Sequence, residues 1–138
     1  MRICLPALAL LCACATAKPA SQPLPPDPLA AERQALRDAH FAIARQDYAG
    51  ASRLLIASEG PRFERLSTAE QHDALFDAAF ATKELGKGRE SLEYIFRACQ
   101  LPERTLEDLD FRLELALDLN ETDNAVDTLT AIARQGTV

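Results

Sequence analysis

The 138-residue chain has few aromatic residues and no run of basic ones. Aromatic residues make up 6% of the sequence and hydrophobic residues 48%, which predicts a single helical domain with a core of alanine and leucine. The formal net charge is −6, whereas binding to a nucleic-acid backbone needs clustered Lys and Arg that displace phosphate counterions. We therefore expect no nucleic-acid partner.

Residues that commonly carry metal or covalent chemistry are also scarce. The two histidines, His40 and His72, stand far apart in the chain, and neither has a second ligand at zinc spacing. Three of the four cysteines lie in the first fourteen residues, which leaves Cys99 on an apolar helix face as a small, buried hydrophobic residue. The sequence has no glycine-rich phosphate loop and no nucleophile elbow. These absences predict a protein without metal, cofactor or catalytic activity.

The first residues have the pattern of an export signal. Met1 and Arg2 give a short positive start, and an apolar run follows from Ile3 to Leu11. This run is too short to cross a bilayer but suits the hydrophobic region of a signal peptide. We expect residues 1–13 to be absent from the mature protein.

The stretch Leu11–Cys14 (LCAC) resembles the lipobox of bacterial lipoproteins. The resemblance implies that Cys14 becomes the acylated first residue and anchors the protein in a membrane. Because Ala15 rather than Asp follows it, the sorting rule of enteric lipoproteins implies the periplasmic face of the outer membrane. A second interpretation stays open, because Ala15–Ala17 forms an A-x-A site, and cleavage after Ala17 would release a soluble periplasmic protein.

Residues 14–28 are predicted to form a tether. Five prolines between Lys18 and Pro28 forbid a helix and favour extended polyproline II. At about 3.1 Å per residue, such a segment could hold the following domain up to roughly 40 Å from the bilayer.

From residue 29 to residue 138 the apolar periodicity predicts six amphipathic helices. Their starts are marked by capping residues and capping boxes, namely Asp27 before Pro28, Asp47, Ser67 with Glu70, and Thr105 with Asp108. The predicted helices span residues 29–45, 48–58, 68–85, 89–100, 106–119 and 124–134.

Each helix is expected to bury one apolar stripe. In the central hairpin, from Leu75 to Pro102, one stripe comprises Leu75, Ala78, Ala79 and Thr82, and the other comprises Leu92, Ile95, Phe96 and Cys99. Small residues on both sides, including Ser91 and Ala98, allow these helices to approach closely. The last helix has its stripe at Ala125, Val126, Leu129, Ile132 and Ala133.

The helix pairs resemble the tetratricopeptide repeat (TPR), a 34-residue helix–turn–helix unit. Repeats start at Glu32, His72 and Leu106, so the second interval has the length of the family unit and the first is lengthened by a loop. At the family's two small-residue positions stand Ala39, Ala79 and Leu113, then Ala51, Ser91 and Ala125. The resemblance implies an all-α fold in which three antiparallel helix pairs stack as a short TPR-like α-solenoid.

The family's ligand groove is lined by the first helix of each repeat. By resemblance the groove positions are Leu36, His40 and Ile43, then Phe76, Phe80 and Lys83, then Asp110, Glu114 and Leu117. Phe76 and Phe80 either grip a peptide or partner helix or pack against a neighbouring repeat, and both interpretations stay open. The outer face of the last helix is a further expected contact surface, either for a partner or for a second copy of the chain.

These features together predict a protein-interaction adaptor with a partner protein or peptide. The lipobox reading places it on a lipid anchor in the bacterial envelope, where it would support a larger assembly such as secretion, pilus or outer-membrane machinery. The alternative is a soluble periplasmic accessory that binds an enzyme and regulates it.

Overall fold

The computed structural model describes residues 26–135. The predicted signal peptide, lipid attachment at Cys14, cleavage after Ala17 and most of the tether lie outside the described residues, as do residues 136–138.

Within this range the chain forms six α-helices and one short 3₁₀ helix. They are α1 (Ala30–Ala44), α2 (Tyr48–Ser58), η1 (Phe63–Arg65), α3 (Thr68–Glu84), α4 (Gly88–Ala98), α5 (Leu106–Asp118) and α6 (Thr122–Gln135). This confirms the predicted all-α fold, and every predicted helix boundary lies within two residues of the observed one. No helix of residues 26–135 is long and apolar enough to cross a membrane.

The predicted helix starts are confirmed at α2, α3 and α5. The Asp47 carboxylate accepts the N–H of Gly50 at 2.9 Å. At α3 and α5 both halves of the capping box are present. In each box the N-cap hydroxyl accepts the N–H of the third helical residue, whose carboxylate in turn accepts the N–H of the N-cap residue.

The prediction that Asp27 is the N-cap of α1, with Pro28 in its first turn, is wrong. The Asp27 carboxylate accepts the N–H of Leu29 at 2.9 Å, which closes a turn around Pro28. The helix therefore begins at Ala30, and Leu29 occupies the N-cap position without a side-chain cap.

The same turn joins the two helices of each pair. Each of the three turns contains one residue with positive φ. These residues are Gln46 (φ 63°), Gly86 (φ 73°) and Asn120 (φ 57°). The following residue is held in the same way each time, because the N–H groups of Asp47, Lys87 and Glu121 donate to the carbonyls of Ala42, Thr82 and Ala116. The three turns recur at the intervals that separate Glu32, His72 and Leu106, so the structure has the register that the sequence spacing predicts.

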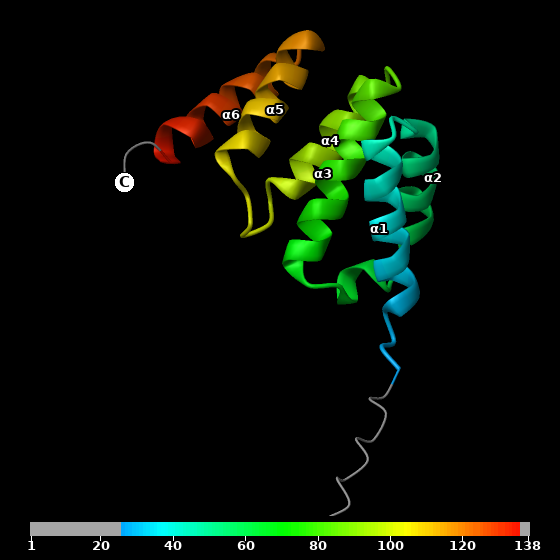
Figure 1. Ribbon diagram of the computed structural model, residues 1–138. Coiled ribbons are helices and arrows are strands. Elements are labelled where there is room, and N and C mark those ends of the chain that lie inside the picture. The colour runs from blue at the N-terminus through cyan, green and yellow to red at the C-terminus, as the bar shows by residue number, and fades with distance from the viewer. Residues whose placement is uncertain (1–25, 136–138) are drawn as a thin grey trace, which may run out of the picture.

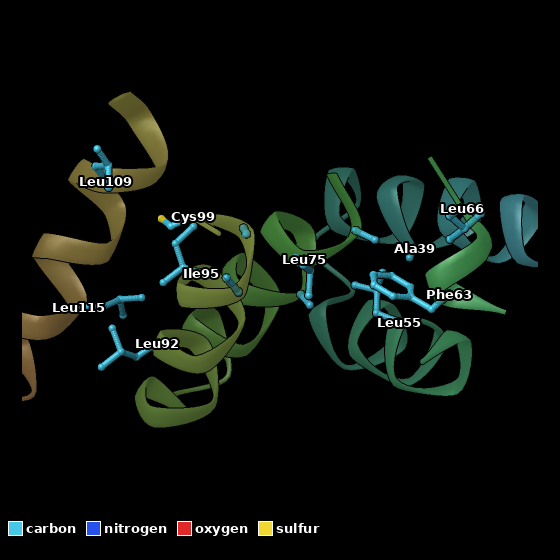
Figure 2. Packing of buried hydrophobic residues seen from close by; sticks show 14 of the residues in the cluster. Ala39, Leu55, Phe63, Leu66, Leu75, Leu92, Ile95, Cys99, Leu109 and Leu115 are labelled. Carbon is cyan, nitrogen blue, oxygen red and sulfur yellow. The ribbon is translucent and has the colours of Figure 1, made fainter. Parts of the chain in front are cut away.

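The three antiparallel pairs α1–α2, α3–α4 and α5–α6 pack one after another in a row (Figure 1). Buried apolar residues run along the row and join the pairs into one core (Figure 2). Within the central pair the helices approach closely, since Ala79 and Ser91 are fully buried and the Ser91 hydroxyl donates to the Ala79 carbonyl at 2.6 Å. The close approach of α3 and α4 that these small residues predict is confirmed.

Two predicted stripes are buried only in part. On α4 the Phe96 side chain is exposed, while Leu92, Ile95 and Cys99 are buried. The Phe96 ring instead forms a surface over which the Arg112 guanidinium lies, 4.7 Å from the ring centroid. The aromatic ring is covered on one side by this cation rather than by the core.

On α6 the predicted stripe is displaced around the helix. Val126 and Leu129 are exposed, whereas Thr128 is fully buried with its hydroxyl donating to the Asn124 carbonyl at 2.6 Å. Thr128 tolerates burial because this hydrogen bond satisfies its polar group.

Candidate binding groove on the first helices

Two adjoining hollows lie along α1, α3 and α5. The first has a volume of about 360 Å³, and it is lined by Arg33, Leu36, Arg37, His40, Phe41, Glu70, Asp73, Ala74 and Asp77. The second, of about 380 Å³, is lined by His40, His72, Asp73, Phe76, Asp77, Thr105, Glu107 and Asp108. His40, Asp73 and Asp77 belong to both, so the hollows form one surface feature, called the groove below.

Three of the residues predicted for a groove line it. Leu36 and His40 come from α1, and Phe76 comes from α3. Phe76 is half-buried, and its ring packs against Phe111 of α5 with centroids 5.7 Å apart. It therefore contributes both to the groove wall and to the contact between the second and third helix pairs.

The other predicted residues of α1 and α3 lie beyond the groove lining. Ile43 packs against the small buried cluster of Ala42, Ala51 and Ala81. The Phe80 ring is half-buried and meets the Tyr48 ring edge-on at 6.0 Å, which joins α3 to α2.

Lys83 links α3 to α5. Its ammonium group lies 2.7 Å from the Glu114 carboxylate and 4.9 Å from the centroid of the Phe111 ring. Asp110 and Leu117 are exposed on α5, and neither lines the groove. Of the predicted α5 residues, Glu114 therefore meets Lys83 of α3, whereas Asp110 and Leu117 line neither hollow.

A histidine–carboxylate pair crosses the groove at each boundary between helix pairs. The His40 ring nitrogen lies 3.1 Å from the Asp77 carboxylate, and His72 Nε2 lies 2.9 Å from Asp108 Oδ2. His40 is exposed, whereas both partners of the second pair are buried. The first pair faces solvent and the second is part of the packing between α3 and α5.

The surroundings change the pKa of two of these groups. Burial raises the pKa of the Asp77 carboxyl, and the hydrogen bond with His40 opposes this increase only in part. For His72, burial disfavours the charged ring, but the hydrogen bond and charge of Asp108, with a smaller contribution from Asp73, outweigh it and raise the pKa.

An ion pair closes one end of the groove. The Arg33 guanidinium lies 2.5 Å from both the Asp27 and the Glu70 carboxylates. The hydrogen bond with Arg33 and that with the Ser67 N–H lower the pKa of Glu70 to about 2. These three charges fix the start of α1 against the start of α3.

Sequence reasoning missed the carboxylates that define the groove, which are Asp73, Asp77 and Asp108. Asp108 was assigned only to a helix cap, yet the same oxygen that accepts the Thr105 N–H also faces His72. A signal was available, because Asp77 and Asp108 follow His40 and His72 by about one repeat. Residues one repeat apart face each other when the repeats stack.

The groove offers hydrogen bonds and charges of both signs for binding. Within residues 26–135 no three His, Cys, Asp or Glu side chains converge as a metal ion would require. Comparisons with protein-family models, with curated proteins and with solved structures found no match to this chain. The functional assignment therefore rests on the geometry of the groove and on the residue patterns.

Proposed function

We propose that this protein is a TPR-like adaptor that binds a segment of a partner protein in the groove on α1, α3 and α5. The observation that carries the proposal is the continuous lining of the two hollows, which combines apolar side chains with exposed charges. Binding sites for peptides commonly pair an apolar surface with a few polar groups that fix orientation.

The charges of the groove determine what kind of segment it fits. Asp73 and Glu107 are exposed, and neither forms an ion pair with Lys or Arg among residues 26–135. Both carboxylates therefore suit basic residues of the ligand. Arg37 at the α1 edge is exposed and suits an acidic residue. Leu36, Ala74 and Phe76 supply apolar contact area between them. The proposed ligand is therefore an amphipathic segment with separated basic and acidic positions.

The location completes the proposed role. The lipobox-like stretch that ends at Cys14 supports a lipid-anchored protein on the periplasmic face of the bacterial outer membrane. An adaptor held there by a tether would recruit its partner to a larger envelope assembly of the secretion, pilus or outer-membrane type.

Site-specific photocrosslinking in intact cells tests the groove. A photoreactive amino acid at His40 lies in both hollows, and the same group at Ile56 on α2 is a matched control because Ile56 is exposed outside the groove. We expect a protein adduct from position 40 that Asp73→Lys abolishes, and no such adduct from position 56. Adducts that are the same at both positions, or an adduct at position 40 that survives Asp73→Lys, would contradict the proposal.

Incorporation of radiolabelled palmitate tests the anchor. The wild-type chain should carry the label and the Cys14→Ser variant should not. An unlabelled wild-type protein found in the periplasm would exclude the lipid anchor and favour the alternative, a soluble periplasmic accessory that binds and regulates an enzyme.

A further inference from the structure

The row of helix pairs ends with α1 and α2 on one side and with α5 and α6 on the other (Figure 1). No other helix of residues 26–135 covers either side. On the α5–α6 side Leu106, Leu117, Val126 and Leu129 are 52%, 61%, 56% and 52% exposed. Four large exposed apolar side chains on two adjoining helices make this side a candidate contact surface.

The register of the repeated turn shows what this surface corresponds to. On α3, His72 and Phe76 contact Asp108 and Phe111 of α5. One repeat later in the chain, Leu106 corresponds to His72 and Asp110 to Phe76. Lys83 also contacts Phe111, and its equivalent is Leu117.

The second helix of the pair gives the same correspondence. On α4, Phe96 lies against Arg112, and Leu92 belongs to the same buried cluster as Leu115, which Figure 2 shows beside it. One repeat further along the chain, Leu92 corresponds to Val126 and Phe96 to Thr130. The outer side of α5 and α6, called the α5–α6 face below, is therefore the surface that holds α5 on α3 and α4, repeated one unit later.

A helix that occupies this face should present residues equivalent to those by which α5 docks. These docking residues are Asp108, Phe111, Arg112 and Leu115, and their equivalents two repeats earlier, on α1, are Gln34, Arg37, Asp38 and Phe41. All four α1 residues are exposed, and the surface that they form is called the α1 face below. Two of them, Arg37 and Phe41, also line the first hollow of the groove, so the α1 face adjoins the groove. Phe41 is 61% exposed, although it is a large apolar residue.

Two of the contacts that this register brings together are complementary. In this register Arg37 takes the place of Phe111, and Asp110 takes the place of Phe76. The ring contact between Phe76 and Phe111 is thus replaced by a contact between opposite charges. Phe41 corresponds to Leu115 and Val126 to Leu92, which belong to one buried cluster, so the register places Phe41 near Val126. Asp110 forms no ion pair among residues 26–135, and Arg37 hydrogen-bonds Gln34 alone there, at 2.7 Å, so both charges are available in a chain whose groove is empty.

We propose that the α5–α6 face of one copy binds the α1 face of a second copy, so that copies of this chain stack head to tail. Such an interface is heterologous and leaves one free face of each kind, which allows rows of several copies. A symmetric pairing of two α5–α6 faces is disfavoured by charge, since nine acidic residues and three Arg lie between Glu103 and Arg134. This inference does not rest on the proposed groove ligand, because the purified chain alone should associate.

Charge exchange tests the proposal with the purified full chain. Sedimentation velocity over a wide range of protein concentration should show reversible association of the wild type. Arg37→Glu and Asp110→Arg should each weaken association about tenfold, because each places like charges together at the interface. The Arg37→Glu/Asp110→Arg double variant should restore association, since each interface again joins opposite charges. Arg53→Glu on α2, an equal change of charge at an exposed site, should have no such effect.

A second pair of variants tests the apolar part. Phe41→Ser and Val126→Ser should each weaken association, and their melting temperatures should stay near the wild-type value because both side chains are exposed. A wild-type chain that stays monomeric at all concentrations would overturn the proposal. So would association that Asp110→Arg changes but Arg37→Glu does not, because that pattern defines a symmetric α5–α6 pairing.

Discussion

The buried contact between His72 and Asp108 predicts that the stability of this domain depends on pH. The pair joins α3 to α5, with 2.9 Å between His72 Nε2 and Asp108 Oδ2. The same carboxylate oxygen also accepts the N–H of Thr105 at 2.6 Å. The pair therefore stabilises both the start of α5 and its attachment to the second helix pair.

The direction of the pH dependence follows from the raised pKa of His72. A histidine whose pKa is higher in the folded state than in the unfolded state binds its proton more tightly after folding. Its contribution to the free energy of unfolding is complete below the ordinary pKa of 6.5 and is lost as the pH rises through the folded-state pKa. The domain should therefore lose stability above about pH 6.5.

The size of the effect follows from the kind of hydrogen bond. A hydrogen bond to a charged group contributes about 1.5–3 kcal/mol, and a neutral one about 0.5–1.5 kcal/mol. A double-mutant cycle with His72→Phe and Asp108→Asn isolates the contribution of the pair, and the introduced amide keeps an oxygen for the Thr105 N–H. We expect a coupling energy of about 2 kcal/mol near pH 5.5 and about 1 kcal/mol or less near pH 8.5.

Urea unfolding followed by far-UV circular dichroism measures this coupling energy at both pH values. The matched control is a cycle on His40 and Asp77, whose histidine is exposed, and its coupling energy should stay below about 1 kcal/mol. A coupling energy for His72 and Asp108 that is below about 0.5 kcal/mol near pH 5.5, or that increases with pH, would refute the reasoning.

Three further predictions concern the packing of the domain. Phe76→Ala and Phe80→Ala should each lower the free energy of unfolding by about 2 kcal/mol, because each ring is half-buried against another ring. The Cys99 thiol should react with iodoacetamide near pH 8 about 100-fold more slowly in the folded protein than in urea, because burial raises its pKa to about 11. Glu70→Gln should lower stability near neutral pH by about 0.5–1 kcal/mol while keeping the helix cap, and the difference should disappear as the pH falls from 4.5 to about 2.

Each of these predictions has its own check. Chemical denaturation measures both phenylalanine variants, and a loss below about 0.5 kcal/mol would show that the rings are not structural. Mass spectrometry of the Cys99 peptide follows the alkylation, and equal rates in folded and unfolded protein would contradict the buried thiol. For Glu70, the free energy of unfolding of the wild type and of Glu70→Gln is measured as the pH is lowered. If the wild type is still more stable at the lowest pH, the effect comes from the helix cap and not from the charge.

The sequence predicted the helices well because the signals that define them are local. A capping box such as Ser67 with Glu70 needs only residues three positions apart. The turns at Gln46, Gly86 and Asn120 recur at the predicted spacing, and Gly86 has the residue type that positive φ favours. The small residues Ala79 and Ser91 similarly predicted close helix packing.

The sequence predicted the candidate groove less well, because its lining depends on contacts between repeats. Asp108 has the same local pattern whether it only caps α5 or also binds His72. Phe76 and Phe80 share one helix face, yet one ring turns to α5 and the other to α2. Spacing along one helix does not determine which neighbouring helix a side chain meets.

The sequence by itself thus determined an all-α chain of three helix pairs and their repeat spacing, since periodicity and capping act over a few residues. Only the tertiary structure decided which apolar residues are covered. Val126 and Leu129 follow the same pattern as the buried Leu92 and Ile95, but no described helix packs on them. Burial is a property of the neighbour as much as of the residue, and that neighbour is what the proposed second copy would supply.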